Sequence, residues 1–116
     1  LQELSAEGRS RVLLRMADVL ESSEEAITAA NVRDIEAAES SGLSKQLLNR
    51  LQLTPAKLAT LAAGLRSIAG QEDPLGKLIS QTELADSLVL DKISCPIGVL
   101  LIIFESRPDC IVQIMA

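Results

Sequence analysis

The sequence predicts an α/β protein in which four helices come first and a few strands come last. Residues 5 to about 74 repeat apolar side chains at three- and four-residue steps, which is the spacing of one helix face. Leu88 and Leu90, together with Lys92 and Ile93, indicate a half-exposed strand. Residues 97–104 hold seven large apolar residues and one glycine. Such a run is typical of a strand buried on both faces of a parallel sheet.

The first two predicted helices follow from caps and apolar spacing. Ser5 is placed to cap the first, and Ser22 with Glu25 has the spacing of a capping box that opens the second. The second helix is expected to run to Ala38, and Gly42 is placed to end it with a positive φ angle. The apolar face of the first helix consists of Val12, Leu13, Met16, Ala17 and Leu20.

Two further helices are predicted before residue 74. Ser44 is expected to cap a short one, and Thr54 followed by Pro55 reads as an N-cap with proline at the first helical position. Gly70 closes the last helix. The apolar positions are Leu47, Leu48 and Leu51 in the short helix, and Leu58, Leu61, Leu65 and Ile68 in the last.

The remaining residues divide into two segments after the helical part, residues 1–74. Residues 75–95 are a strand segment, in which 75–84 fits a short helix or a strand, and residues 96–116 are a strand, turn and helix. Asp109 opens that last helix. The strand over 97–104 would bury several large side chains, each contributing about 1.5–3 kcal/mol. Residues 1–116 supply too few neighbouring strands for this, so the sheet is expected to be incomplete.

Composition excludes several function classes. The net charge is −5 and no Lys or Arg stripe is present, so a nucleic-acid surface is not expected. No segment reaches the roughly 18 apolar residues of a membrane span. The chain has no histidine, which excludes histidine catalysis, and no metal site is predicted. Cys95 and Cys110 are expected to be small buried hydrophobes.

One motif carries a family resemblance. The stretch Pro96-Ile-Gly-Val-Leu-Leu-Ile-Ile-Phe-Glu-Ser-Arg-Pro-Asp109 resembles the matching part of the γ-glutamyl phosphate reductases, in the aldehyde dehydrogenase superfamily. It is most similar to the reductase half of the bifunctional eukaryotic Δ1-pyrroline-5-carboxylate synthases. Other pieces agree in order: 30–38, 48–51, 53–58, 64–69, 73–76 and 88–92. The resemblance implies the N-terminal part of an aldehyde-dehydrogenase-like fold, with 97–104 as the first buried strand of its cofactor-binding sheet.

The resemblance also implies a chemistry. Such enzymes use NADPH to reduce L-glutamate 5-phosphate to L-glutamate 5-semialdehyde in proline biosynthesis, through a thioester on a cysteine. That cysteine lies downstream of the Glu-Ser-Arg-Pro turn, and neither Cys95 nor Cys110 occupies its place. No catalytic residue is therefore expected in this chain, which should be inactive alone. A homo-oligomer joined through the region near 78–92 and a cytoplasmic location are also expected, with plastid and mitochondrion left open.

The resemblance places part of a site in this chain. Ile103, Phe104, Glu105 and Ser106 would line the nicotinamide side of the NADPH pocket, and Arg107 would bind the acyl phosphate. A guanidinium offers a fork of donors to phosphate oxygens. Simpler interpretations stand beside these: Arg107 as a surface partner of Glu105 or Asp109, Glu105 as a structural residue, and Ser106 or Asp109 as a helix cap.

A second hypothesis from another class is a helical interaction module. Such a module would pair its apolar strand with a partner chain. It explains the amphipathic helices equally well, but not why a buried strand should end in a charged Glu-Ser-Arg-Pro turn and reopen as a helix.

Overall fold

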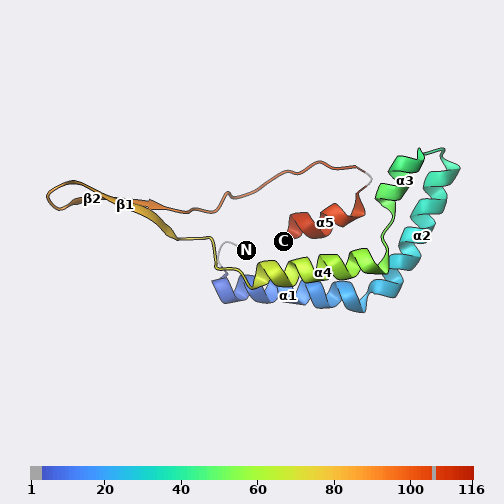
Figure 1. Ribbon diagram of the computed structural model, residues 1–116, viewed down its shortest axis with the longest axis horizontal. Helices are drawn as coiled ribbons and strands as arrows, with labels where there is room; N and C mark the ends of the chain where they lie inside the picture. Colours follow the sequence, from blue (N-terminus) through green and yellow to red (C-terminus); the bar gives the residue numbers. More distant parts are fainter. Residues whose placement is uncertain (1–3, 106) are drawn as a thin grey trace.

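The computed structural model describes residues 4–105 and 107–116 and confirms the α/β class. Within these residues it has five helices and one two-stranded sheet (Figure 1). The helices are α1 (Ala6–Ser22), α2 (Glu24–Ser40), α3 (Lys45–Leu51), α4 (Pro55–Ala69) and α5 (Pro108–Met115); the strands are β1 (Leu78–Ala85) and β2 (Leu88–Ile93).

Helices α1 and α4 lie side by side and form the core (Figure 1). Ala17 of α1 and Ala62 of α4 are fully buried against each other's helices, together with Leu65. Small side chains at this seam let the two backbones approach closely. Val112 of α5 packs on the same cluster, so the last helix is held against α1 and α4 through apolar contact.

Most predicted helix ends are confirmed. The Ser5 side chain accepts a hydrogen bond from the Gly8 N–H (3.1 Å), and Thr54 Oγ1 accepts one from the Lys57 N–H (3.2 Å). Ser44 takes the N-cap position of α3, although its side chain makes no cap bond. Gly42 has φ of 73° after the end of α2.

The capping box predicted at Ser22 is wrong. Ser22 is the last residue of α1, and its hydroxyl donates to the Val19 carbonyl (3.1 Å). Ser23 takes the N-cap position of α2 without a side-chain bond. A capping side chain needs an extended backbone. Ser23 has φ −103° and ψ 9° because α2 starts directly after α1.

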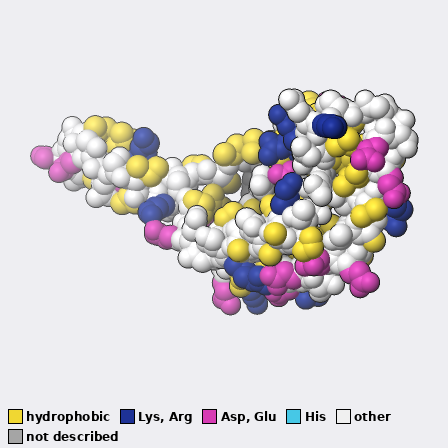
Figure 2. Space-filling view, turned by 45° about the vertical axis from the view of Figure 1, so that its right-hand side comes forward, with side chains coloured by type: hydrophobic (Ala, Val, Ile, Leu, Met, Phe, Trp, Pro, Cys, Tyr) yellow, Lys and Arg dark blue, Asp and Glu magenta, His cyan; other side chains and the backbone are white. Residues whose placement is uncertain are grey.

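The strands form an antiparallel hairpin with a two-residue turn at Asp86 and Ser87. The hairpin projects away from the helices (Figure 1). The strand predicted over 88–93 is confirmed, but its residues are exposed on both faces rather than half-buried. In Figure 2 apolar side chains lie on the surface of the hairpin and on the narrow part of the molecule that joins the hairpin to the helices.

The prediction of a buried strand over 97–104 is wrong for this chain. The segment lies outside any helix or strand, and its apolar side chains are exposed. They alternate: Ile97, Val99, Leu101 and Ile103 are 82–100% exposed, whereas Leu100, Ile102 and Phe104 are 43–63% exposed. The period of two is that of a strand. No described residue forms strand pairing with it. This agrees with the expectation that the chain supplies too few neighbouring strands.

The molecule is elongated, with principal extents of 71 × 28 × 21 Å. Figure 1 shows the segment after β2 returning along the helices to the start of α5. No described helix is long and apolar enough to cross a membrane.

Candidate functional site

The predicted site residues lie where the chain enters α5. Arg107 takes the N-cap position, and Pro108 occupies the first helical position, where its missing N–H costs no hydrogen bond. Asp109 lies in the first turn instead of capping the helix. Ser106, expected to line the cofactor pocket or cap this helix, lies outside the described residues.

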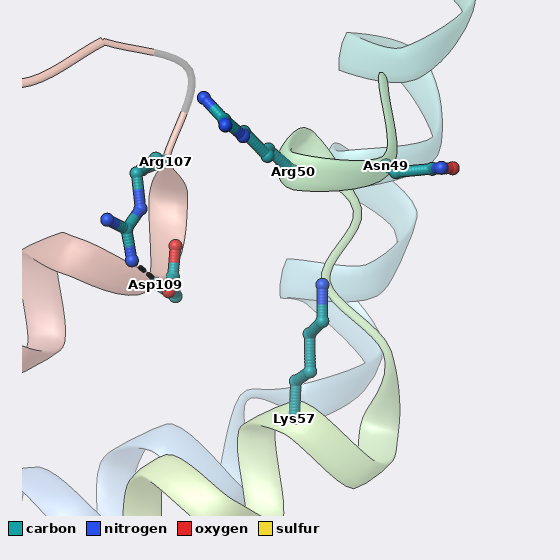
Figure 3. A pocket seen from close by; sticks show the side chains of 5 residues that line it. All are labelled: Asn49, Arg50, Lys57, Arg107 and Asp109. Atoms are coloured by element: carbon teal, nitrogen blue, oxygen red, sulfur yellow. Dashed lines mark hydrogen bonds and ion pairs between the residues drawn. The ribbon is translucent and has the colours of Figure 1, made fainter. Parts of the chain in front are cut away.

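A hollow of about 390 Å³ opens in front of this turn. Its lining comes from the end of α3 and the start of α4, which are neighbours in sequence, and from the start of α5, which follows much later. The lining residues are Asn49, Arg50, Lys57, Arg107 and Asp109. In Figure 3 the Arg50 side chain reaches from α3 toward the turn that carries Arg107, and Lys57 points from α4 toward α3. Asn49 points away from the gap in this view.

The charge of the hollow is positive, although the chain is acidic. Its lining residues include two arginines and one lysine but only one acidic residue. The Arg107 Nη2 and the Asp109 Oδ2 are 3.4 Å apart, a long ion pair at a surface position. This contact agrees with the simpler interpretation of Arg107 as a surface partner of Asp109. Figure 2 shows several Lys and Arg side chains close together in the upper part of the helical body.

Sequence reasoning missed Arg50 and Lys57 as neighbours of Arg107. Arg50 lies within the motif over 48–51 and Lys57 within that over 53–58, both of which carry the resemblance. Their place within these motifs is the one feature of the sequence that draws attention to the two residues. It does not show that the two residues lie beside residue 107, because this proximity arises only when α5 packs on α4.

The residues expected to face the cofactor come shortly before Arg107 in the sequence. Ile103 and Phe104 present exposed apolar side chains, and Glu105 is exposed as well. Ile103, Phe104 and Glu105 lie outside any helix or strand, and Arg107 is the N-cap residue of α5.

Neither cysteine is fully buried, so the prediction of two buried hydrophobes is wrong for Cys95. Cys95 follows β2 at the start of the uncovered segment and is exposed. Cys110 is partly buried in the first turn of α5. Among the described residues no cluster of cysteine, aspartate or glutamate could hold a metal ion.

Two groups of ion pairs join α1 to α4 and to the connection that follows α4. The pKa of the Asp73 carboxyl lies below its ordinary value, first because it accepts the Leu75 N–H (3.0 Å) and second because it pairs with Arg9. Arg66 of α4 donates to Glu21 of α1 (2.7 Å), and this hydrogen bond lowers the pKa of that carboxyl. Arg66 also donates to Asp18 (3.0 Å).

Comparison with curated proteins finds long matches to one pair of related enzymes, whereas no family model matches the chain. The chain is 51% identical, over 98% of its length, to a Δ1-pyrroline-5-carboxylate synthase of Oryza sativa subsp. japonica. It is 44% identical, over its whole length, to a γ-glutamyl phosphate reductase of Trichormus variabilis. The chain spans 16% of the first protein and 27% of the second.

Solved structures agree with these matches. The crystal structure of γ-glutamyl phosphate reductase from Saccharomyces cerevisiae matches 97% of the chain with a TM-score of 0.92 and 41% identity. That from Thermotoga maritima matches 98% with a TM-score of 0.90 and 26% identity. The chain covers 29% and 28% of these structures.

Proposed function

We propose that this chain, a homologue of part of the γ-glutamyl phosphate reductases and the Δ1-pyrroline-5-carboxylate synthases, is the N-terminal segment of such a reductase. The longer protein, called the parent protein below, reduces L-glutamate 5-phosphate to L-glutamate 5-semialdehyde in proline biosynthesis. The observation that carries this proposal is the structural match over 97% of the chain, which includes most of its unpaired segment.

The exposed segment over 97–104 supports the proposal. It keeps the alternation of a strand without strand partners among the described residues. A segment with this pattern forms a buried strand when strands of a larger sheet pair with its edges and helices cover its faces. In this proposal residues 1–74 are the helical part of the cofactor-binding domain, 75–95 the hairpin that joins subunits, and 96–116 the first strand, turn and helix of the cofactor sheet.

The cofactor proposed for the parent protein is NADPH, which supplies a hydride when it is bound. Ile103 and Phe104 present exposed apolar side chains, which fit one wall of a pocket for a flat ring, and Glu105 and Ser106 would continue that wall. The described residues contain no glycine-rich phosphate loop, so the rest of the cofactor site would come from other parts of the parent protein.

Arg107 is proposed to bind the acyl phosphate of the substrate. Only one of its terminal nitrogens pairs with Asp109, and at 3.4 Å this contact is long. Its guanidinium therefore retains donors for phosphate oxygens.

Replacing Arg107 by alanine in the parent protein tests this role. The variant should lose about tenfold or more in kcat/KM for the substrate, because a hydrogen bond to a charged group contributes about 1.5–3 kcal/mol. NADPH affinity, measured by fluorescence titration, should change far less. Equal activity of variant and wild type would contradict the assignment.

This chain alone is proposed to be inactive, with the reacting cysteine elsewhere in the parent protein. Neither thiol lines the hollow that contains Arg107. The parent protein is also proposed to be a cytoplasmic homo-oligomer in which the hairpin joins subunits. Leu78, Ile79, Leu88 and Leu90 are at least half exposed there, which favours a covered surface. A monomer in sedimentation analysis would contradict this part of the proposal.

A further inference from the structure

We propose that Arg50 and Lys57 join Arg107 in one binding site for the phosphoryl group of an acyl-phosphate substrate. The inference rests on the proposed function for the identity of the substrate. It adds two residues, from α3 and α4, that lie about fifty residues before the turn at 105–109.

The charge balance of the hollow favours a dianion. Arg50, Lys57 and Arg107 bring three positive charges and Asp109 brings one negative charge, an excess of two. The whole chain has 11 basic and 16 acidic residues, so a local positive excess opposes its overall balance. The repulsion among these like charges is offset when an anion binds between them. A phosphoryl group with two negative charges matches the excess, whereas a carboxylate carries only one.

The donors of the hollow remain available to a ligand. Lys57 Nζ uses one hydrogen to donate to the Gln52 carbonyl (2.6 Å), which holds the ammonium at the hollow and leaves two further hydrogens. Arg50 forms no ion pair with any carboxylate of the part of the chain that the structure describes. Arg107 pairs with Asp109 through one nitrogen only.

The backbone around these side chains is firmly placed. Lys57 lies in the first turn of α4, whose start is capped by Thr54. Arg50 lies in the last turn of α3, and the following connection is held by the buried Asn31. In Figure 3 Arg50 extends from α3 toward the turn that carries Arg107, and Lys57 extends from α4 toward α3. A site made from helix positions keeps its geometry better than one made from loops alone.

The reverse reaction of the parent protein offers the sharpest test. There the aldehyde and inorganic phosphate form the acyl phosphate, while NADP⁺ accepts the hydride and a proton is released. Inorganic phosphate is a separate substrate in this direction, so its KM reports on the phosphoryl site directly. The variants are Arg50→Gln and Lys57→Gln, and the matched control is Arg11→Gln, an exposed arginine of α1 outside the hollow.

Arg50→Gln and Lys57→Gln should each raise the KM for phosphate about tenfold or more, the loss expected for one charged hydrogen bond. The KM for NADP⁺ should stay within about twofold, and Arg11→Gln should match wild type in both. An unchanged KM for phosphate in Arg50→Gln, with an unchanged thermal midpoint, would overturn the inference. A rise in the KM for NADP⁺ alone would also overturn it, because the site would then bind a cofactor phosphate.

A binding measurement separates this inference from the proposed function. Inorganic phosphate can be titrated into the parent protein by calorimetry, without turnover. If the wild type binds phosphate and Arg50→Gln binds it about tenfold or more weakly, the site stands even where no reductase activity is found. Equal binding by both proteins, or no binding by either, would overturn the site.

Discussion

Asn31 holds the connection between α3 and α4 from inside the helical body. It is 4% exposed, its Nδ2 donates to the Leu51 carbonyl (2.9 Å), and its Oδ1 accepts the Leu53 N–H (2.7 Å). These backbone groups lie where α3 ends and the chain turns toward α4. The same connection joins the helices of Arg50 and Lys57, so Asn31 supports the hollow without lining it.

Asn31→Leu should lower the free energy of unfolding of the parent protein by about 2–4 kcal/mol, because it leaves a backbone donor and a backbone acceptor without partners. Chemical denaturation with urea measures this change. Gln46→Ala, at an exposed polar position of α3, should stay within about 0.5 kcal/mol. Similar losses in both variants would contradict the structural role of Asn31.

The lowered pKa of Asp73 implies that this residue makes a pH-dependent contribution to folding stability. Its folded pKa lies below the unfolded value, chiefly through the Leu75 N–H and then through Arg9. At a pH above the unfolded pKa, the carboxyl is ionised in both states and its contribution to folding stability is fully present. This contribution is lost as the pH falls through the folded pKa. The thermal midpoint of Asp73→Asn should therefore lie below that of wild type at pH 7. The difference should shrink below roughly pH 4, and a constant difference across that range would contradict the assignment.

At the scale of elements, the packing of α1 on α4 organises the helical body. Ala17 and Ala62 are both 0% exposed, so the two backbones approach with no room for larger side chains. The ion pairs of Arg66 with Glu21 and Asp18 lie beside this seam. Exposed ion pairs contribute little, so the apolar seam is the main source of stability between the helices.

Ala62→Leu should destabilise the parent protein by about 1–3 kcal/mol through overpacking. The neighbouring Ala63 is exposed, so Ala63→Leu is a matched control and should change the free energy of unfolding by less than about 0.5 kcal/mol. Urea denaturation of both variants tests the seam. A neutral Ala62→Leu would show that α1 and α4 lie further apart than described.

Local patterns in the sequence predict most elements correctly because their causes are local. The caps at Ser5 and Thr54, the end near Gly42 and the strand over 88–93 all depend on neighbours within a few residues. Burial of 97–104 depends on strands that the chain does not supply, so that prediction is wrong here. The contribution of Arg50 and Lys57 to the hollow depends on the packing of α5, which no local pattern encodes.

The whole molecule leaves much of its apolar surface exposed. A hairpin with exposed apolar faces and an uncovered strand-like segment extend from a helical body over 71 Å. Soluble proteins rarely leave such large apolar surfaces uncovered. The solved structures that match this chain are more than three times as long. We propose that other parts of the parent protein cover these surfaces.

We propose that this chain is a reductase segment that needs the rest of the parent protein for activity. The decisive measurement is a phosphate-dependent assay of NADP⁺ reduction with L-glutamate 5-semialdehyde, run on both this chain and the parent protein. We expect activity in the parent protein and none in residues 1–116. A well-folded parent protein without activity would contradict the reductase assignment and favour a helical interaction module. Activity in the short chain would contradict the placement of the reacting cysteine outside it.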